Sequence, residues 1–305
     1  MIADDGSKPR PPTPNDASRA VTWRLLTRDI RFGQLPILMG IINVTPDSFS
    51  DGGRFAALDA AVELGERLAA GGAAILDVGG ESTRPYATPV VETEEMRRVI
   101  PVVQALAERT HLPISIDTSK ASVAREALLA GAEIINDVTG LESDPRMLAV
   151  AVDSGAGICA MHMQGTPQTM QDAPIYADVV EEIHLYLQQR RDALLAAGIA
   201  HERICLDPGI GFGKTNQHNL TLLANSHRFL DLGCPILVGH SRKGFIAKVL
   251  DNKEADRTAA TVGVSLSLAR QGVHVLRVHD VAEVRQAIEL FEATGGLDGS
   301  ARAID

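Results

Sequence analysis

Eight short runs of aliphatic residues recur along the chain, and they restrict its possible folds more than any other feature of the sequence. Each run is rich in Ile, Val or Leu, which is typical of strands that are buried on both faces of a parallel sheet. The runs are residues 36–43, 73–78, 112–117, 132–137, 156–162, 203–207, 234–239 and 273–279. The sequence therefore predicts eight buried strands.

The segments between the runs have helical periodicity. Apolar residues repeat at helical spacing over residues 58–69 and 281–291, and Asp280 precedes the second segment, where we expect it to cap the helix. Four runs follow a glycine of the kind that ends a helix in the left-handed conformation. These glycines are Gly72, Gly131, Gly155 and Gly272. The pattern is a repeated strand and helix.

A closed (β/α)8 barrel accounts for this repetition. The polar residues that end successive runs are 19 to 45 residues apart, which is too irregular for a solenoid with a fixed period. An open doubly wound sheet is the alternative, but no glycine fingerprint follows the first run. We therefore predict an α/β fold, a single (β/α)8 TIM barrel over residues 20–295, with a short N-terminal hairpin at residues 21–32 that caps the barrel bottom.

The two ends of the chain differ from the barrel in composition. Residues 1–19 contain four prolines among polar residues, and residues 296–305 are similarly polar. Such segments cannot bury enough apolar surface to offset the entropy of ordering them. We expect a disordered tail at residues 1–19 and a C-terminal tail at residues 296–305.

The charge of the chain bears on its partners. The 305 residues include 29 Lys and Arg against 39 Asp and Glu, a net charge of −10. This balance argues against nucleic acid and against an anionic membrane surface, because both select a basic face. We expect small-molecule substrates instead.

The cysteines and the N-terminus bear on the compartment. Cys159, Cys205 and Cys234 lie in or beside apolar runs and have no C-x-x-C spacing, which predicts buried thiols in a reducing environment. No apolar stretch approaches the roughly 18 residues of a membrane span, and the first residues lack the apolar segment of a secretory signal. We expect a cytoplasmic protein.

Hydrogen-bonding or charged side chains stand at the end of nearly every run. They are Asn43, Asp77, Asp117, Asn136 with Asp137, Met161 with His162, Asp207, Ser241 with Lys243, and Arg277 with His279. Asn, Asp and Ser are also favoured as helix caps, which is the alternative interpretation of each one taken alone. Capping does not require Lys, Arg or His, so the whole set predicts a binding site where the carboxyl ends of barrel strands converge.

The chemistry of this set suggests the kind of ligand. Two carboxylates and an asparagine that face inward suit a flat ligand with a row of N–H donors, and the Lys and Arg side chains suit a carbonyl group and an anion. Arg277 and His279 are two residues apart on one strand and therefore point the same way, so a diphosphate would suit them.

Two other sites are not supported. The segment GIGFGKT at residues 209–215 is similar to a phosphate-binding loop, but Pro208 stands where that motif needs its first glycine. The nine histidines are scattered and include no H-E-x-x-H, so the sequence does not predict a tightly held zinc ion.

Eight motifs together resemble the dihydropteroate synthase family and occur in that family's order. They are MGIINVTPDSFSDGG (39–53), DVGGESTRP (77–85), SIDTSK (115–120), INDVTG (135–140), MHMQGTPQTMQ (161–171), LDPGIGFGKT (206–215), SRK (241–243) and RVHDV (277–281). The resemblance implies a (β/α)8 barrel, usually a homodimer. It implies condensation of 6-hydroxymethyl-7,8-dihydropterin diphosphate with 4-aminobenzoate in folate synthesis, with diphosphate released and Mg²⁺ present.

The resemblance also implies roles for individual residues. The pterin would be held by Asp117, Asn136, Asp207, Lys243 and Arg277, with Asp77 at the pocket floor. The diphosphate would contact Asn43, Thr83, Arg277 and His279, with Asn43 also at the magnesium ion. The aminobenzoate site and its loops would use Phe49, Asp51, Arg84, Pro85, Ser241, Lys243 and Gly244, and Phe212 is either a pocket wall or a packing residue.

The mechanism that the resemblance implies begins with loss of diphosphate. The carbocation left on the exocyclic carbon is then attacked by the neutral aniline nitrogen. The catalytic residues would be Asp117, Lys243, Arg277 and His279, and sulfonamides would compete with aminobenzoate. Loops 43–53 and 79–90 would exclude water from the cation.

Three positions depart from the commoner family pattern. Gly244 follows SRK where many relatives carry Ser, Tyr86 follows STRP where Gly is frequent, and His240 precedes SRK where a small or apolar residue is usual. We expect each to lie near the aminobenzoate mouth and to affect affinity for aminobenzoate and sulfonamides.

Two other functions use a similar barrel. A methyltetrahydrofolate methyltransferase would bind a pterin through Asp117, Asn136 and Asp207, but it has no diphosphate to hold with Arg277 and His279. A paralogue that binds pterins or a partner without turnover would not need every anion-binding position that this sequence has.

Overall fold

Eight parallel strands form the centre of the molecule in a computed structural model, which describes residues 19–45 and 53–302. The strands are β3 (Ile37–Asn43), β4 (Ile75–Gly79), β5 (Ile114–Asp117), β6 (Ala132–Asp137), β7 (Gly157–Met161), β8 (Ile204–Asp207), β9 (Leu237–Val238) and β10 (Val275–Val278). Each coincides with one of the eight aliphatic runs, with β4 extending one residue beyond its run to Gly79, so the prediction of eight buried strands is confirmed.

The order of the strands makes the sheet a barrel. It is β8-β7-β6-β5-β4-β3-β10-β9, and all neighbours are parallel. The two end strands meet through a parallel bridge between Leu206 and Ile236, and the Leu206 N–H donates to the Pro235 carbonyl at 2.9 Å. The predicted (β/α)8 barrel is confirmed, with its closure between β8 and β9.

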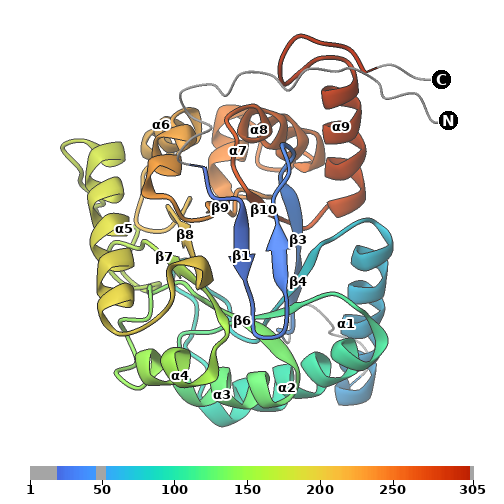
Figure 1. Cartoon of the computed structure of the whole chain (residues 1–305), viewed down its shortest axis with the longest axis vertical. Coiled ribbons are helices and arrows are strands. Elements are labelled where there is room, and N and C mark those ends of the chain that lie inside the picture. The colour runs from blue at the N-terminus through green and yellow to red at the C-terminus, as the bar shows by residue number, and fades with distance from the viewer. Residues whose placement is uncertain (1–18, 46–52, 303–305) are drawn as a thin grey trace, which may run out of the picture.

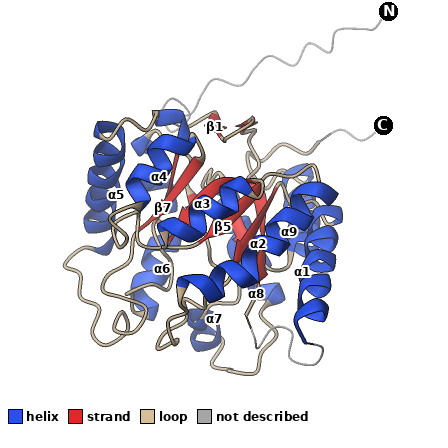
Figure 2. Ribbon diagram, turned by 90° about the horizontal axis from the view of Figure 1, so that it is seen from below, coloured by secondary structure: helices blue, strands red, loops and turns tan. Residues whose placement is uncertain are grey.

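Helices surround the strands on the outside (Figures 1 and 2). They are α1 (Gly53–Ala70), α2 (Glu92–Arg109), α3 (Ala121–Leu129), α4 (Met147–Ser154), α5 (Val179–Ala196), α6 (Asn216–Ala224), α7 (Gly244–Val249), α8 (Thr258–Arg270) and α9 (Val281–Ala293), with 3-10 turns at His201–Arg203 and Ser226–Leu232. The helices predicted at residues 58–69 and 281–291 are confirmed as parts of α1 and α9. In the described part of the chain, no helix combines the length and the apolar composition of a membrane span.

The capping role predicted for Asp280 is wrong. Asp280 is the residue before α9, but its side chain makes no cap hydrogen bond. It forms an ion pair with the Arg242 guanidinium instead, whose Nε lies 3.0 Å from Asp280 Oδ2. A nearby cation is a stronger partner for a carboxylate than the backbone N–H groups of a helix.

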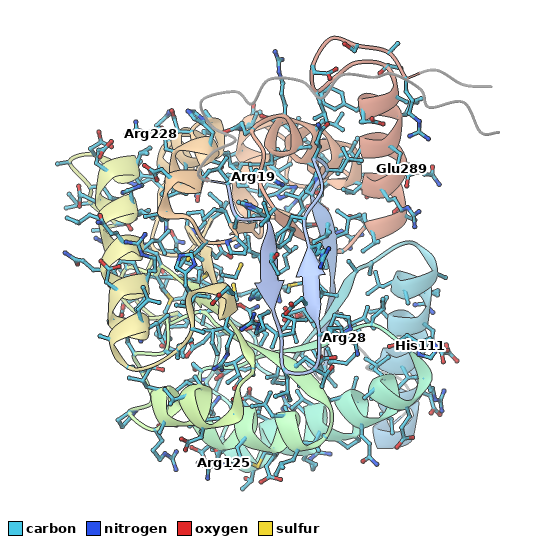
Figure 3. The ribbon with its side chains drawn as sticks, in the orientation of Figure 1. Arg19, Arg28, His111, Arg125, Arg228 and Glu289 are labelled. Atoms are coloured by element: carbon cyan, nitrogen blue, oxygen red, sulfur yellow. The ribbon has the colours of Figure 1, made fainter. Side chains whose placement is uncertain are left out.

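The N-terminal hairpin closes the bottom of the barrel, as predicted. Strands β1 (Thr22–Arg24) and β2 (Asp29–Arg31) pair antiparallel. Trp23 is fully buried and donates its indole N–H to the Arg203 carbonyl at 3.0 Å. Figure 3 shows Arg28 beside the hairpin, where it donates to the His111 carbonyl at 2.6 Å. These contacts attach the hairpin to the strand ends opposite the predicted site.

The barrel interior has an apolar lower half. Its inward side chains form a cluster separate from the larger core between strands and helices. The cluster contains Trp23, Leu25, Met39, Ile75, Ile134, Cys159, Cys205, Leu237 and Val275. Because this half is filled and sealed by the hairpin, a ligand can enter the barrel only from the carboxyl ends of the strands.

The first prediction concerns this seal. We expect Trp23→Ala to lower the free energy of unfolding by about 3–5 kcal/mol, because it removes a large buried side chain and leaves a cavity. Urea unfolding followed by circular dichroism measures the change, since Trp23 is the one tryptophan of the chain. Val21→Ala is the matched control, because Val21 is 70% exposed. A loss no larger than that of the control would mean that the hairpin does not stabilise the barrel.

Candidate active site at the carboxyl ends of the strands

A second ring of inward side chains lies above the apolar cluster, and it is polar. Successive side chains of a strand alternate between its two faces, so the residue two positions after an inward apolar residue also points inward. Four strands have this pairing: Ile75 with Asp77, Ile134 with Asn136, Cys205 with Asp207, and Val275 with Arg277. The alternation explains why Asn136, and not its neighbour Asp137, is the inward residue at the end of β6.

Arg277 connects the carboxylates of this ring. Its Nε lies 2.6 Å from Asp77 Oδ2, and its Nη2 lies 2.7 Å from Asp117 Oδ2. Asn136 donates from Nδ2 to both Asp77 oxygens at 3.3 and 3.4 Å. The structure thus brings four of the predicted pterin-binding residues together in one network.

The network is electrostatically strained. Burial opposes the charge of Arg277, but Asp77 and Asp117 together raise its pKa. Burial raises the pKa of Asp117 to about 7, although Arg277 acts in the opposite direction. The Arg277 guanidinium therefore opposes the effect of burial on Asp117 and is a shared cation for two buried carboxylates.

Asp207 and Lys243 form the opposite side of the ring. Asp207 is buried, and its Oδ1 accepts the Gly209 N–H at 2.7 Å. Within the described chain, its other oxygen accepts no hydrogen bond. Burial raises the pKa of Asp207, while the Gly209 N–H and Lys243 lower it.

The Lys243 ammonium lies over the Phe212 ring, 4.2 Å from the ring centroid, and donates to the Ile210 carbonyl. Burial lowers the pKa of Lys243 to about 7, against the effect of Asp207. Phe212 therefore packs against the Lys243 side chain and forms a wall of the site around the Lys243 ammonium.

The glycine-rich segment after β8 needs glycine at two positions beside the site. Gly209 has φ +71°, and a Cβ there would lie 1.9 Å from the His162 carbonyl oxygen. Gly211 has φ +86°, and its Cβ would lie 2.8 Å from Lys243 Cδ. The glycines thus let the loop approach both β7 and the lysine side chain.

Lys214 has a structural role within this segment. Its ammonium is buried, 3.0 Å from His162 Nδ1 and 2.9 Å from the Phe212 carbonyl. Burial lowers the pKa of Lys214 far below its ordinary value, and burial together with Lys214 lowers that of His162 to about 3. The contact between Lys214 and His162 was not predicted from sequence. The available signal was that Lys214 belongs to a segment similar to a phosphate-binding loop but lacking its first glycine, which indicates a role other than phosphate binding.

His279 and Ser241 meet at the end of β10. His279 Nδ1 lies 3.0 Å from Ser241 Oγ, and the His279 backbone N–H also donates to that oxygen at 3.3 Å. Burial, followed by the charge of Arg277, lowers the pKa of His279 to about 4, so the ring is neutral at pH 7. Ser241 therefore orients His279. The sequence predicted Ser241 at the aminobenzoate site and His279 at the diphosphate.

The remaining predicted residues lie on the rim. Asn43 is exposed at the end of β3, Thr83 is half-buried, and Arg84 and Pro85 are exposed in the loop between β4 and α2. Gly244 begins α7, and a Cβ there would have no atom within 4 Å. Phe49 and Asp51 lie outside the described residues, as does most of the loop predicted at residues 43–53.

The predicted position of His240 near the mouth is wrong. His240 is fully buried, and its Nε2 lies 2.9 Å from Ser265 Oγ and 3.2 Å from the Thr261 carbonyl on α8. Neighbouring side chains in extended backbone point in opposite directions. Ser241 points into the barrel, so His240 points outward to the helices.

An ion cluster below the rim was also not predicted. The Lys120 ammonium lies 2.6 Å from Glu81 Oε2 and contacts the fully buried Glu95. Glu81 Oε1 accepts the Val90 N–H at 2.8 Å, so the cluster closes the base of the loop at residues 80–91. The available signal in the sequence was the opposite charge of Glu81 in the motif ESTRP and Lys120 in the motif SIDTSK, since these motifs follow neighbouring strands.

The mouth has a defined chemical character. Asp207, Asp117 and Asn136 each keep one oxygen that accepts no hydrogen bond within the described chain. Such oxygens suit the N–H groups of a flat heterocycle, and Arg277, Lys243 and neutral His279 suit carbonyl and anionic oxygens.

Known proteins with similar sequences and folds point to the same chemistry. The profile of the family described as pterin binding enzyme matches residues 39–279. The dihydropteroate synthase of Escherichia coli strain K12 is 48% identical over 259 residues, which are 85% of this chain and 92% of that protein. That of Bacillus subtilis strain 168 is 41% identical over 267 residues, 87% of this chain and 90% of that protein.

Solved structures agree with the sequence comparison. A Yersinia pestis dihydropteroate synthase in complex with a sulfonamide drug has a TM-score of 0.84 at 42% identity, covering 90% of this chain and 99% of that one. A Xanthomonas albilineans dihydropteroate synthase with 4-aminobenzoic acid has a TM-score of 0.84 at 44% identity, covering 90% and 98%. Another structure of the Xanthomonas enzyme, with 7,8-dihydropteroate, has a TM-score of 0.80 at 42% identity with the same coverage.

The second prediction tests the shared guanidinium. We expect Arg277→Ala to lower the free energy of unfolding by about 3–5 kcal/mol at pH 8, because it leaves Asp77 and Asp117 buried without their cation. The loss should be smaller at pH 5.5. Burial already raises the pKa of Asp117, and without Arg277 it rises further, so the folded variant binds a proton that the unfolded chain releases.

Stability that depends on this proton is lost as the pH rises through the folded pKa. Urea unfolding at both pH values measures the difference, and Arg84→Ala on the exposed rim is the matched control. An equal loss at both pH values would contradict the shared role of Arg277.

Proposed function

The chain belongs to the pterin binding enzyme family as a dihydropteroate synthase, which condenses a pterin with 4-aminobenzoate to dihydropteroate, and we propose that it does so by losing diphosphate before the amine attacks. One observation carries the proposal. The acceptor oxygens of Asp207, Asn136 and Asp117 share a single barrel mouth with the Lys243, Arg277 and His279 side chains.

Pterin recognition follows from the side-chain oxygens of Asp207 and Asn136 that accept no hydrogen bond within the described chain. Asp207 Oδ2 accepts from the 2-amino and N3 hydrogens of the ring, and Asn136 Oδ1 accepts at the adjacent edge. Lys243 donates to the ring carbonyl. Hydrogen bonds from the ring N–H groups to a carboxylate oxygen are charge-assisted, so this contact supplies much of the affinity. Asp77 contributes indirectly, because it orients Asn136 and Arg277.

The diphosphate is held on the opposite side of the mouth. Arg277 provides a permanent charge, and Thr83 provides a hydroxyl donor. When the Ser241 hydroxyl donates to His279 Nδ1, the proton of the neutral ring is on Nε2 and is available to a phosphate oxygen.

Magnesium fits this side of the mouth. Mg²⁺ in phosphate sites typically keeps several waters and takes few protein ligands besides the substrate oxygens. Asn43 offers one neutral amide oxygen in an exposed position, and no cluster of three metal-ligating side chains exists within residues 19–45 and 53–302. We assign the ion to Asn43 and the substrate diphosphate, where it supplies positive charge to the leaving group.

The reaction breaks one bond and forms another. The bond between the exocyclic carbon and the diphosphate oxygen breaks, and the electron pair leaves with the diphosphate. The carbocation is delocalised into the pterin ring and stabilised by the Asp117 carboxylate. The aniline nitrogen then donates its lone pair to the carbon, which forms the C–N bond and leaves a positive charge on nitrogen. The proton of this acidic anilinium passes to water or to the released diphosphate, so no strong base is needed.

The second substrate binds at the rim. We assign aminobenzoate and competing sulfonamides to Ser241, Lys243 and Gly244, with Arg84 and Pro85 contributed by loop 80–91 and Phe49 and Asp51 by the preceding loop. Solved structures of relatives contain a sulfonamide drug and 4-aminobenzoic acid, which supports the choice of these ligands. We further propose a homodimer in the cytoplasm, whose mass light scattering would measure.

The third prediction uses the two different roles of the Asp207 oxygens. We expect Asp207→Asn to weaken binding of a simple pterin by about 2–4 kcal/mol, because an amide donor then faces ring donors. The amide oxygen can still accept from Gly209, so the unfolding midpoint should change little. Calorimetry and thermal unfolding measure the two effects. Unchanged affinity would mean that Asp207 only closes the turn.

The fourth prediction tests the order of events. We expect the wild-type enzyme to release diphosphate slowly without aminobenzoate, because water can attack the carbocation. His279→Ala should slow this release by about 10- to 100-fold, since it removes a donor to the developing charge. Its affinity for a pterin that lacks diphosphate should stay within about twofold of wild type.

Chelation of Mg²⁺ should slow the release as well. A phosphate-release assay with and without aminobenzoate measures both effects. Release that depends strictly on aminobenzoate would contradict a dissociative step.

A further inference from the structure

Tyr86 connects two loops of the barrel mouth that are far apart in sequence. It lies in loop 80–91 between β4 and α2, and its backbone N–H donates to the Pro167 carbonyl at 3.1 Å. Its hydroxyl donates to Asp172 Oδ1 at 2.9 Å. Both partners belong to loop 162–178, between β7 and α5.

The backbone of Tyr86 indicates that these bonds hold it in place. Its φ is +62°, in the left-handed region that residues with a Cβ disfavour. The side chain is 66% exposed, so burial in the core does not compensate for this conformation. The hydrogen bonds to loop 162–178 do, and the Asp172 carboxylate also raises the pKa of Tyr86, which keeps the hydroxyl a donor.

Beside Tyr86, one further bond joins the two loops, from Gln168 Nε2 to the Ala87 carbonyl at 3.4 Å. The remaining attachments of loop 80–91 to the barrel lie at its base. Glu81 accepts from Val90 and Lys120, and Arg98 donates to the Gly80 carbonyl at 3.0 Å. Between this base and Tyr86 lie Thr83, Arg84 and Pro85. The position of these residues over the site therefore depends on how the tip of the loop is held.

The tip reaches the reactive part of the mouth. Arg84 precedes Tyr86 by two residues at this tip, and its charge is among those that lower the pKa of His279 after burial and Arg277. Loop 162–178 is in turn attached to the pterin side, where Gln171 donates to the Gly211 carbonyl at 2.8 Å. Gly211 is the glycine packed against Lys243.

We propose that Tyr86 and Asp172 are positioning residues, forming a latch that joins loop 80–91 to loop 162–178 and fixes Arg84 and Pro85 for the second substrate. The identity of that substrate rests on the proposed function. The latch itself rests on the two Tyr86 hydrogen bonds and the left-handed backbone.

Hydrogen exchange tests the latch without reference to activity. We compare Tyr86→Phe, Asp172→Ala and the double variant with Tyr186→Phe as matched control, because the Tyr186 hydroxyl donates at 2.7 Å to Glu142 Oε2, which belongs to neither loop. Tyr186→Phe keeps the ring contact of residue 186 with His162 and removes only the hydroxyl. Each latch variant should exchange amides of residues 82–90 and 165–172 faster, by about the same factor in both loops. The control should match wild type there. Exchange that rises in one loop only, or in neither, overturns the latch.

Steady-state kinetics test its effect on the reaction. Each latch variant should raise the KM for aminobenzoate about three- to tenfold, in line with loss of one hydrogen bond, with kcat and the affinity for a pterin that lacks diphosphate within about twofold of wild type. The double variant should resemble either single variant, because both remove the same bond. Additive effects, or an unchanged KM, overturn the positioning role.

The two proposals fail differently. Absence of dihydropteroate formation by the wild-type enzyme overturns the proposed function, while the exchange experiment still decides whether the latch exists. Tyr86→Gly distinguishes the effect of backbone strain from the effect of losing the hydroxyl, because glycine adopts the left-handed conformation without strain but has no hydroxyl. It should raise exchange and KM as Tyr86→Phe does. Wild-type values for Tyr86→Gly would overturn the role of the hydroxyl.

Discussion

The interior of a closed eight-stranded barrel offers little water, so every charged side chain that points inward needs a partner of opposite charge. This constraint governs the mouth of the barrel. Arg277 compensates Asp77 and Asp117, and Lys243 lies near enough to Asp207 for each to affect the other's pKa. Removing Arg277 leaves two buried carboxylates without their cation, which costs several kcal/mol. The charges that recognise the ligand therefore also determine whether the barrel is stable.

The same compensation prepares the site for its substrates. In the structure, the second oxygens of Asp207 and Asp117 point to no protein donor among the described residues, so the ring of a pterin can satisfy them without breaking existing hydrogen bonds. Arg277 is held by two carboxylates in the position from which it can contact an anion. Groups fixed in advance in this way need little reorganisation during the reaction, which is the main source of electrostatic catalysis.

Much of this arrangement could be predicted from sequence because it follows from periodicity. Apolar runs predict the strands, and alternation along a strand separates Asn136 from Asp137 once one inward residue is known. The pairing of Arg277 with Asp77 and Asp117 could not be predicted, since these residues are 200 and 160 positions apart and their distance depends on strand register around the barrel. His240 was misplaced because its position beside the SRK motif suggested the mouth, whereas its side chain points away from the barrel interior and contacts α8.

The energies of the contacts divide the mouth into a fixed cradle and an adjustable rim. Pairs such as Arg277 with Asp77 are buried, and breaking one costs about 3–5 kcal/mol, so the cradle stays assembled through each turnover. The Tyr86 and Asp172 contact is exposed, and a hydrogen bond of this kind contributes about 0.5–1.5 kcal/mol. An opening cost of that size changes the closed-to-open ratio by roughly tenfold or less. A rim held by buried ion pairs would retain the product, whereas one held by exposed hydrogen bonds can close over aminobenzoate and still release dihydropteroate.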